Sequence, residues 1–191
     1  MKESWKEHPL GNPFTIGDKI VGIAMNYLGQ EEVSGNMGFE DSMFEKKMKA
    51  VGWEKRQAWC AYFTELVWKE AYRESYPDLV LTLDKLFSGS AVKTWVNFNN
   101  SKQFASGRIP GVGSVVVWQN YIDGKPDWRG HAGIVTSVYA ERFISVEGNS
   151  NSEGGREGIE IAIQKRRMLF DNDNGLRLKG FIYPFIPEVL I

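Results

Sequence analysis

The single cysteine of the chain, Cys60, begins the strongest predicted helix, which covers residues 58–72. A helix N-terminus carries partial positive charge that stabilises a thiolate, and its free backbone N–H groups can bind a developing oxyanion. A nucleophilic thiol is therefore one interpretation of Cys60. A buried structural cysteine is the alternative, because free cysteine is among the most buried residue types.

A thiol that attacks a carbonyl near neutral pH needs a base, and histidine is the side chain suited to that task. Of the two histidines, His8 lies in a polar N-terminal stretch, whereas His131 begins a predicted strand. The small neighbours Gly130 and Ala132 leave room for other groups to approach the His131 ring. We therefore expect His131 to be the base. A surface histidine or a hydrogen-bonded core histidine is the alternative.

A third group should orient the imidazole. If residues 132–139 and 142–147 form a hairpin, the end of the second strand returns beside the start of the first, and Glu147 lies near His131. Glu147 and Asn149 are two residues apart, so both face the same side of an extended segment. Either side chain can accept a hydrogen bond from the imidazole. A solvated strand end entering a polar loop is the alternative for both.

The elements that would position these residues divide the chain into two halves. Apolar residues at helical spacing predict helices over residues 15–28, 39–51 and 58–72, and a looser, interrupted helical region over 81–98. Extended patterns predict strands over residues 114–119, 132–139, 142–146, 158–164 and 175–183, with an Asn174–Gly175 hairpin turn joining the last two. We therefore predict an α+β fold in which N-terminal helices pack on a C-terminal antiparallel β-sheet.

Composition limits the classes of function. A length of 191 residues predicts one domain, here residues 15–191, preceded by a polar arm over residues 1–14. A net charge of −1 argues against a broad basic surface for nucleic acid, and one cysteine excludes an intrachain disulfide and a cysteine-rich zinc site. No apolar run approaches the ~18 residues of a membrane span. We expect a monomer with no nucleic-acid or membrane partner.

At these residues the sequence resembles the CHAP family, the cysteine, histidine-dependent amidohydrolases and peptidases of the NlpC-type papain-like superfamily. The resemblance rests on residues 57–63 (QAWCAYF), 113–118 (GSVVVW), 130–135 (GHAGIV), 146–149 (VEGN) and 180–184 (GFIYP). One departure is Ser114, which stands where the family usually has an acid. The resemblance implies a papain-like core.

The resemblance also implies roles for individual residues. Cys60 would be the nucleophile and His131 its base, with Glu147 orienting the imidazole and Asn149 assisting or taking part of that role. The backbone N–H of Cys60 would be one oxyanion donor. Gln57 is a candidate for a second donor, and a plain surface-loop residue is its alternative.

Members of the family mostly cleave bacterial peptidoglycan, either between N-acetylmuramic acid and L-alanine or within the stem peptide or crossbridge. The resemblance implies a peptidoglycan or muropeptide substrate and no cofactor. One or two aromatic side chains are expected to line a substrate groove, from the candidates Trp59, Tyr62, Trp95, Trp118 and Trp128.

Some members bind calcium, and residues 171–175 (DNDNG) superficially resemble a calcium loop. The further ligands and the late bidentate Glu of such a loop do not follow, so a hairpin turn explains the segment better and we predict no required metal.

The N-terminal residues lack the apolar core of a signal peptide. We therefore expect synthesis in the cytoplasm and a separate delivery route to the cell wall. Such a route is holin-type release of a phage or prophage endolysin, injection by a secretion machine, or transport on a virion, with a delivery or immunity partner. Two alternatives remain open: an inactive wall-binding or structural module of the same fold, and a cysteine amidase or transferase with another substrate.

Overall fold

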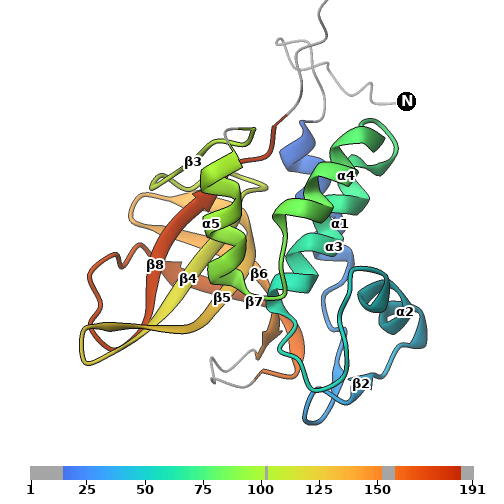
Figure 1. Ribbon diagram of the computed structural model, residues 1–191, viewed down its shortest axis with the longest axis horizontal. Coiled ribbons are helices and arrows are strands. Elements are labelled where there is room, and N and C mark those ends of the chain that lie inside the picture. Colours follow the sequence, from blue (N-terminus) through green and yellow to red (C-terminus); the bar gives the residue numbers. More distant parts are fainter. Residues whose placement is uncertain (1–14, 102, 152–157, 186–191) are drawn as a thin grey trace, which may run out of the picture.

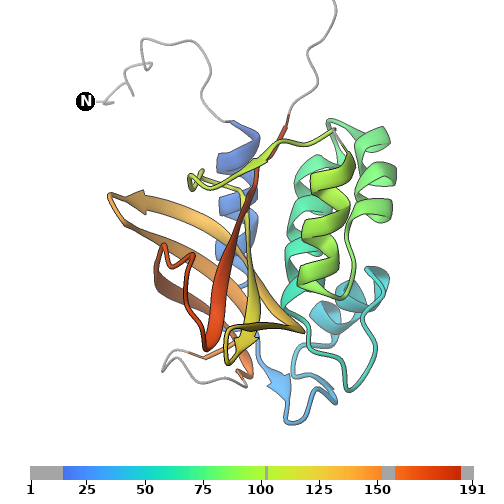
Figure 2. The ribbon, with the colours of Figure 1, turned by 60° about the vertical axis from the view of Figure 1, so that its left-hand side comes forward.

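The computed structural model describes residues 15–101, 103–151 and 158–185, in which a layer of helices packs on an antiparallel β-sheet (Figures 1 and 2). This arrangement confirms the predicted α+β fold. The elements are α1 (Ile16–Asn26), β1 (Glu32–Val33), β2 (Gly38–Phe39), α2 (Ser42–Ala50), α3 (Cys60–Arg73), α4 (Pro77–Leu86), α5 (Ala91–Ser101), β3 (Ser106–Gly107), β4 (Val115–Ile122), β5 (Lys125–Tyr139), β6 (Arg142–Ser150), β7 (Glu160–Arg167) and β8 (Gly175–Ile182). The predicted arm over residues 1–14 lies outside the described residues.

Local sequence signals explain where the helices begin. Thr15 and Asp18 form a capping box at α1, in which Thr15 Oγ1 accepts from the Asp18 N–H at 3.1 Å and the Asp18 carboxylate accepts from the Thr15 N–H at 2.9 Å. Asp41 caps α2 in a similar way. Helix α3 differs, because its N-cap residue, Trp59, makes no side-chain cap bond. The first N–H groups of α3 are therefore left for other partners.

The large sheet has the strand order β3-β8-β4-β5-β6-β7, with every neighbouring pair antiparallel. The predicted hairpin between the last two strands is wrong, because β7 pairs with β6 whereas β8 pairs with β4 and β3. In the sheet interior β8 has hydrogen-bonding partners on both of its edges. The Asn174 side chain instead accepts a hydrogen bond from the Asp123 N–H at 2.9 Å and so supports the β4–β5 turn.

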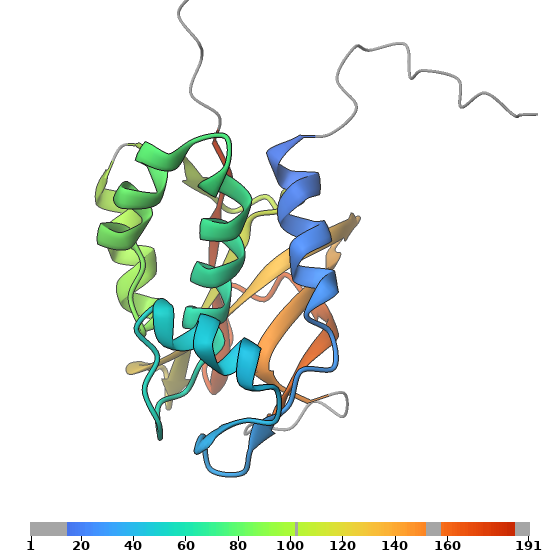
Figure 3. The ribbon, with the colours of Figure 1, turned by 90° about the vertical axis from the view of Figure 1, so that its right-hand side faces the viewer.

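Helix α3 is the centre of the main hydrophobic core. It packs between the sheet and the other helices, as Figure 3 shows from the helical side. Its buried apolar residues include Phe63, Leu66, Val67 and Trp68, and full burial of each such side chain stabilises the fold by roughly 1.5–3 kcal/mol. A smaller cluster, made mainly of Val116, Trp118, Val135, Phe143, Leu178 and Phe181, covers the other face of the sheet. The N-terminus of α3 is thus held firmly against the strands.

The remaining helices also bear on the sequence predictions. The looser, interrupted helical region predicted over residues 81–98 corresponds to α4 and α5, and residues 87–90 separate the two helices. Within residues 15–101, 103–151 and 158–185, none of the helices has both the length and the apolar character that a bilayer crossing requires.

Candidate active site

The thiol of Cys60 lies at the first residue of α3 with only 6% of the residue exposed. It forms a hydrogen bond with the His131 ring and accepts hydrogen bonds from the backbone N–H groups of Ala61 and Ala132. Burial acts to raise the pKa of the thiol, but the charge and hydrogen bond of His131 and the two N–H groups outweigh it, so the pKa of Cys60 lies below its ordinary value. This geometry favours a thiolate.

His131 lies on β5, and its side chain is 14% exposed. Its Nε2 donates to Glu147 Oε2 at 2.8 Å, which leaves Nδ1 to face the Cys60 sulfur. Burial acts to lower the pKa of the imidazole, but the charge and hydrogen bond of Cys60, followed by those of Glu147, raise the pKa of His131 to about 10. The two pKa shifts have opposite signs, so each charged form stabilises the other and the geometry favours a thiolate beside an imidazolium.

Glu147 lies on β6, and its carboxylate is fully buried. Besides the bond from His131, its oxygens accept from Ser145 Oγ at 2.6 Å, from Arg166 Nε at 2.9 Å and from the Arg166 NH2 group. Burial acts to raise the pKa of Glu147, but the hydrogen bonds and charges of Arg166 and His131 lower it to about 2. The carboxylate is therefore an anion throughout the physiological pH range.

Gly133 explains how Glu147 comes close to β5. A Cβ atom at Gly133 would lie 2.6 Å from Glu147 Cγ, a contact that real structures essentially never show. The glycine after His131 and Ala132 thus leaves the space that the Glu147 side chain occupies on its way to the imidazole.

Asn149 takes a different place from the one expected. Its Oδ1 accepts from the Trp59 backbone N–H at 2.9 Å, and its Nδ2 donates to the Gly158 carbonyl at 2.7 Å. Within the part of the chain that the structure describes, it makes no hydrogen bond with His131. Of the two candidate orienting groups, the structure brings Glu147 and not Asn149 to the imidazole, and Asn149 holds the residue directly before Cys60.

Gln57 lies in the loop that leads into α3. Its Oε1 accepts from Tyr62 Oη at 2.8 Å and from the Glu54 N–H at 3.2 Å, so Tyr62 and the preceding loop hold the amide in place. The Tyr62 ring lies against Gly89 in the α4–α5 connection, where a Cβ atom would be 2.3 Å from its oxygen. The Tyr62 side chain therefore links Gln57 to the α4–α5 connection.

Comparison with protein families agrees with this geometry. The CHAP domain model matches residues 52–149, just over half of the chain. The chain belongs to the CHAP family. The matched range contains Cys60, His131 and Glu147, and family membership indicates a function of the peptidoglycan-hydrolase type. No curated protein and no solved structure matches the chain.

Cys60, His131, Glu147 and Arg166 form what we call the CHAP cluster. Some of the aromatic residues predicted to line a groove near it are buried, and others are exposed. Trp59 is 0% exposed and donates from its indole N–H to Glu32, and Trp118 is 4% exposed with its ring 5.7 Å from that of His131. Both side chains are buried, so the structure gives no support for either ring as part of a substrate groove. Tyr62 is partly exposed and Trp128 is 80% exposed, so they stay candidates. Trp95 is partly buried against Gly180.

Arg166 is the member of the cluster that sequence reasoning missed. It lies on β7, outside the matched CHAP range, and its guanidinium binds both oxygens of Glu147. Along β7 and at the residue before it, Ala162 and Gln164 are buried together with Ile161, whereas Ile159 and Ile163 are 47% and 46% exposed. Arg166 shares the face of Ala162 and Gln164, and that alternation is the signal that could have found it.

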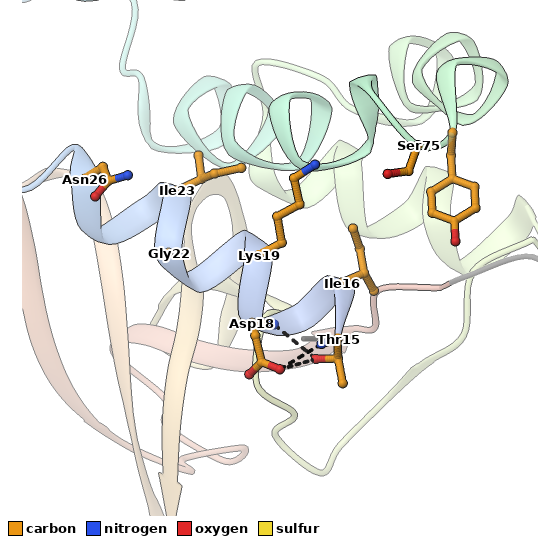
Figure 4. A pocket seen from close by; sticks show the side chains of 9 residues that line it. Thr15, Ile16, Asp18, Lys19, Gly22, Ile23, Asn26 and Ser75 are labelled. Atoms are coloured by element: carbon orange, nitrogen blue, oxygen red, sulfur yellow. Dashed lines mark hydrogen bonds between the residues drawn. The ribbon is translucent and has the colours of Figure 1, made fainter. Parts of the chain in front are cut away.

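Two other features of the molecule lie apart from these residues. A groove of about 560 Å³ lies between α1 and the α3–α4 connection, lined by residues such as Lys19, Ile23 and Tyr76, and it shares no residue with the CHAP cluster (Figure 4). In the calcium-like segment, Asp173 pairs with Arg177 at 2.9 Å. Over the described residues, no group of three or more His, Cys, Asp or Glu side chains is placed to hold a metal ion.

Proposed function

We propose that this CHAP protein hydrolyses an amide bond of bacterial peptidoglycan with Cys60 as the nucleophile. The observation that carries the proposal is the continuous hydrogen-bonded series from Cys60 through His131 to Glu147. A thiolate at a helix N-terminus, an imidazole beside it and a buried anion behind the imidazole form the arrangement that cysteine hydrolases need.

The chemistry follows from these positions. The Cys60 thiolate attacks the amide carbon, and negative charge develops on the carbonyl oxygen near the N-terminus of α3, where the Cys60 N–H is a donor. As the C–N bond breaks, the His131 imidazolium gives its proton to the leaving amine, and a thioester remains on Cys60. Neutral His131 then takes a proton from water, and the resulting hydroxide displaces the thiolate to release a carboxylic acid.

The surrounding residues have supporting roles in this proposal. Glu147 fixes the orientation of His131 and stabilises its charged form. Asn149 holds the Trp59 backbone and thereby the position of the thiol, and the amide nitrogen of Gln57 is the second oxyanion donor. Tyr62 and Trp128 contact the substrate, because they are the exposed members of the aromatic set.

The first test is digestion of purified cell walls, followed as loss of turbidity and release of muropeptides. We expect Cys60→Ala to abolish hydrolysis, because the chain has no second thiol to replace it. The two histidines provide a matched pair, in which His131→Ala abolishes hydrolysis and His8→Ala retains it. Equal activity of the wild type and Cys60→Ala would contradict the proposal, as would absence of activity on a broad panel of walls.

Mass spectrometry of the released products identifies the bond. A free lactyl group on the glycan and a free L-alanine amine identify an N-acetylmuramoyl-L-alanine amidase, whereas new peptide termini identify a stem-peptide or crossbridge endopeptidase. An endolysin role predicts lysis of the host after expression together with a membrane-permeabilising protein.

The second candidate is an inactive wall-binding module of the same fold. The limited exposure of Cys60 is the observation in its favour. It predicts slow alkylation of Cys60 that depends on pH only near the ordinary thiol pKa of ~8.5. Rapid alkylation at neutral pH would exclude this candidate.

A further inference from the structure

We propose that Arg166 is a positioning residue that keeps Glu147 ionised and aimed at His131, so that the mobile proton of the site stays between His131 and Cys60. The inference rests on the proposed function for its catalytic meaning, and it adds a residue from outside the matched family range.

The contact geometry is that of a forked ion pair. Arg166 Nε donates to Glu147 Oε1 at 2.9 Å, while its NH2 group donates to Oε2, the same oxygen that His131 contacts. Two parallel bonds from a planar guanidinium fix the plane of a carboxylate as well as its position. With Ser145 Oγ on Oε1, every direction from which Glu147 accepts is occupied by a fixed donor.

The charge balance explains why an arginine is needed. Glu147 is fully buried, and a buried carboxylate next to a histidine has two ways to lower its energy: it can hold its charge against a cation, or take the proton from the imidazole. The second route leaves both groups neutral and removes the charge that stabilises the imidazolium. Arginine does not give up its proton, so Arg166 supplies a permanent positive charge that favours the first route.

Among the described groups that face Glu147, Arg166 is the one that supplies a permanent positive charge. The titratable or charged groups of the described chain that face it are His131 from β5 and Arg166 from β7, with Cys60 of α3 beyond the imidazole. The Arg166 guanidinium also lies 5.4 Å from the Trp118 ring, which in turn lies beside His131. Its side chain is 29% exposed, compared with 14% for His131 and 0% for Glu147.

The test uses Cys60 as its own reporter. Because it is the single cysteine, the rate of iodoacetamide alkylation as a function of pH reports the thiolate of the site without a substrate. We compare the wild type with Arg166→Met and Arg166→Lys. The matched control is Arg167→Met, which removes the same charge from the next residue, whose side chain is exposed.

In Arg166→Met we expect the acid limb of the alkylation profile to move up by about one pH unit or more, since Glu147 gains a proton more easily and stabilises the imidazolium less. Arg166→Lys keeps the charge but loses the fork, so we expect a smaller shift in the same direction. The profile of Arg167→Met stays that of the wild type. On cell walls, kcat falls in Arg166→Met while KM is retained, because Arg166 does not touch the substrate.

A purely structural Arg166 would lower the melting temperature without moving the pH profile, and that result in a folded Arg166→Met would overturn the inference. If Arg166→Met does not fold, an unshifted profile in folded Arg166→Lys would overturn it equally. Failure of the proposed function gives a different result. A wild type inert on every wall whose alkylation profile still responds to Arg166 would refute peptidoglycan hydrolysis and support the role of Arg166.

Discussion

Helix α3 contributes to two buried clusters of charged side chains. Each cluster contains a glutamate, and the pKa values of the two glutamates shift in opposite directions. In the cluster next to the first residue of α3, the Glu147 carboxylate accepts hydrogen bonds from Arg166, His131 and Ser145. The pKa of that carboxyl is lowered to about 2. One turn further along, Glu65 is also buried, and its partner is Lys69 at 3.3 Å. Burial dominates there and raises the pKa of Glu65 to about 7.

The difference lies in how many fixed donors each carboxylate has. Lys69 is shared, because its ammonium also contacts Asp84 of α4, and it reaches Glu65 along the same helix. Glu147 instead receives donors from β5, β6 and β7, whose positions the sheet determines. Burial alone therefore does not predict whether a carboxylate is charged. The number and rigidity of its donors decide the sign of the pKa shift.

The largest expected effect comes from neutralising each carboxylate in turn. Glu147→Gln keeps the size of the side chain but removes the anion beside His131, so we expect cell-wall hydrolysis to fall by about a hundred-fold or more. Glu65→Gln, the same change in the second cluster, should retain nearly all activity. Similar losses in the two variants would show that the two clusters do not differ in function.

Removing the cation of the second cluster tests its role in stability. Lys69→Met leaves Glu65 without the charge that offsets its burial, and we expect the free energy of unfolding to fall by about 1–3 kcal/mol. The loss should be larger at pH 8 than at pH 6, because a protonated Glu65 no longer needs a cation. Urea unfolding at the two pH values measures it. Cys60 alkylation should be unchanged, in contrast to Arg166→Met.

Taken per pH unit, the smallest effect is the pH dependence of stability, which should have opposite signs for the two groups. The lowered pKa of Glu147 stabilises the fold above the unfolded value of about 4.3, and this contribution is lost as pH falls towards about 2. The raised pKa of Glu65 gives a contribution that is complete below about 4.3 and is lost as pH rises through about 7. Each slope is at most about 1.4 kcal/mol per pH unit.

Glu65→Gln supplies the comparison for that measurement. The free energy of unfolding is measured against pH for both proteins. The wild-type value minus the variant value should decrease between about pH 4.3 and pH 7 and stay constant above that range. A rising difference would mean that the pKa of Glu65 is lowered and that the two clusters are alike.

Cys60 and His131 could be predicted from the sequence because each residue type is rare in the chain and each residue begins a recognisable element. Cys60 is the only thiol, it begins a strongly periodic helix, and His131 begins a strand between small residues. The proximity of Glu147 followed from hairpin geometry alone, and the observed β5–β6 pairing places Ile134 opposite Val146. These inferences needed only local periodicity and one turn.

The remaining contacts depend on which strands become neighbours, which local periodicity does not determine. Arg166 reaches Glu147 because β7 lies next to β6, whereas the sequence indicated a hairpin between β7 and β8. The contact of Asn149 with Trp59 joins residues ninety positions apart. Burial of the Trp59 ring follows from its edge-on contact with Phe39 at 5.1 Å, and Phe39 belongs to the short strand β2, which was expected to be part of a helix.

The position of β8 has a consequence for the order in which the protein matures during synthesis. Strand β4 has β5 on one side and β8 on the other, and β8 is the last of the described strands to be synthesised. Until residues 175–182 leave the ribosome, one edge of β4 has no partner, and the sheet that carries His131 and Glu147 is incomplete. We expect the thiolate to form only after β8 has paired with β4, so that Cys60 stays unreactive while the earlier strands are being synthesised.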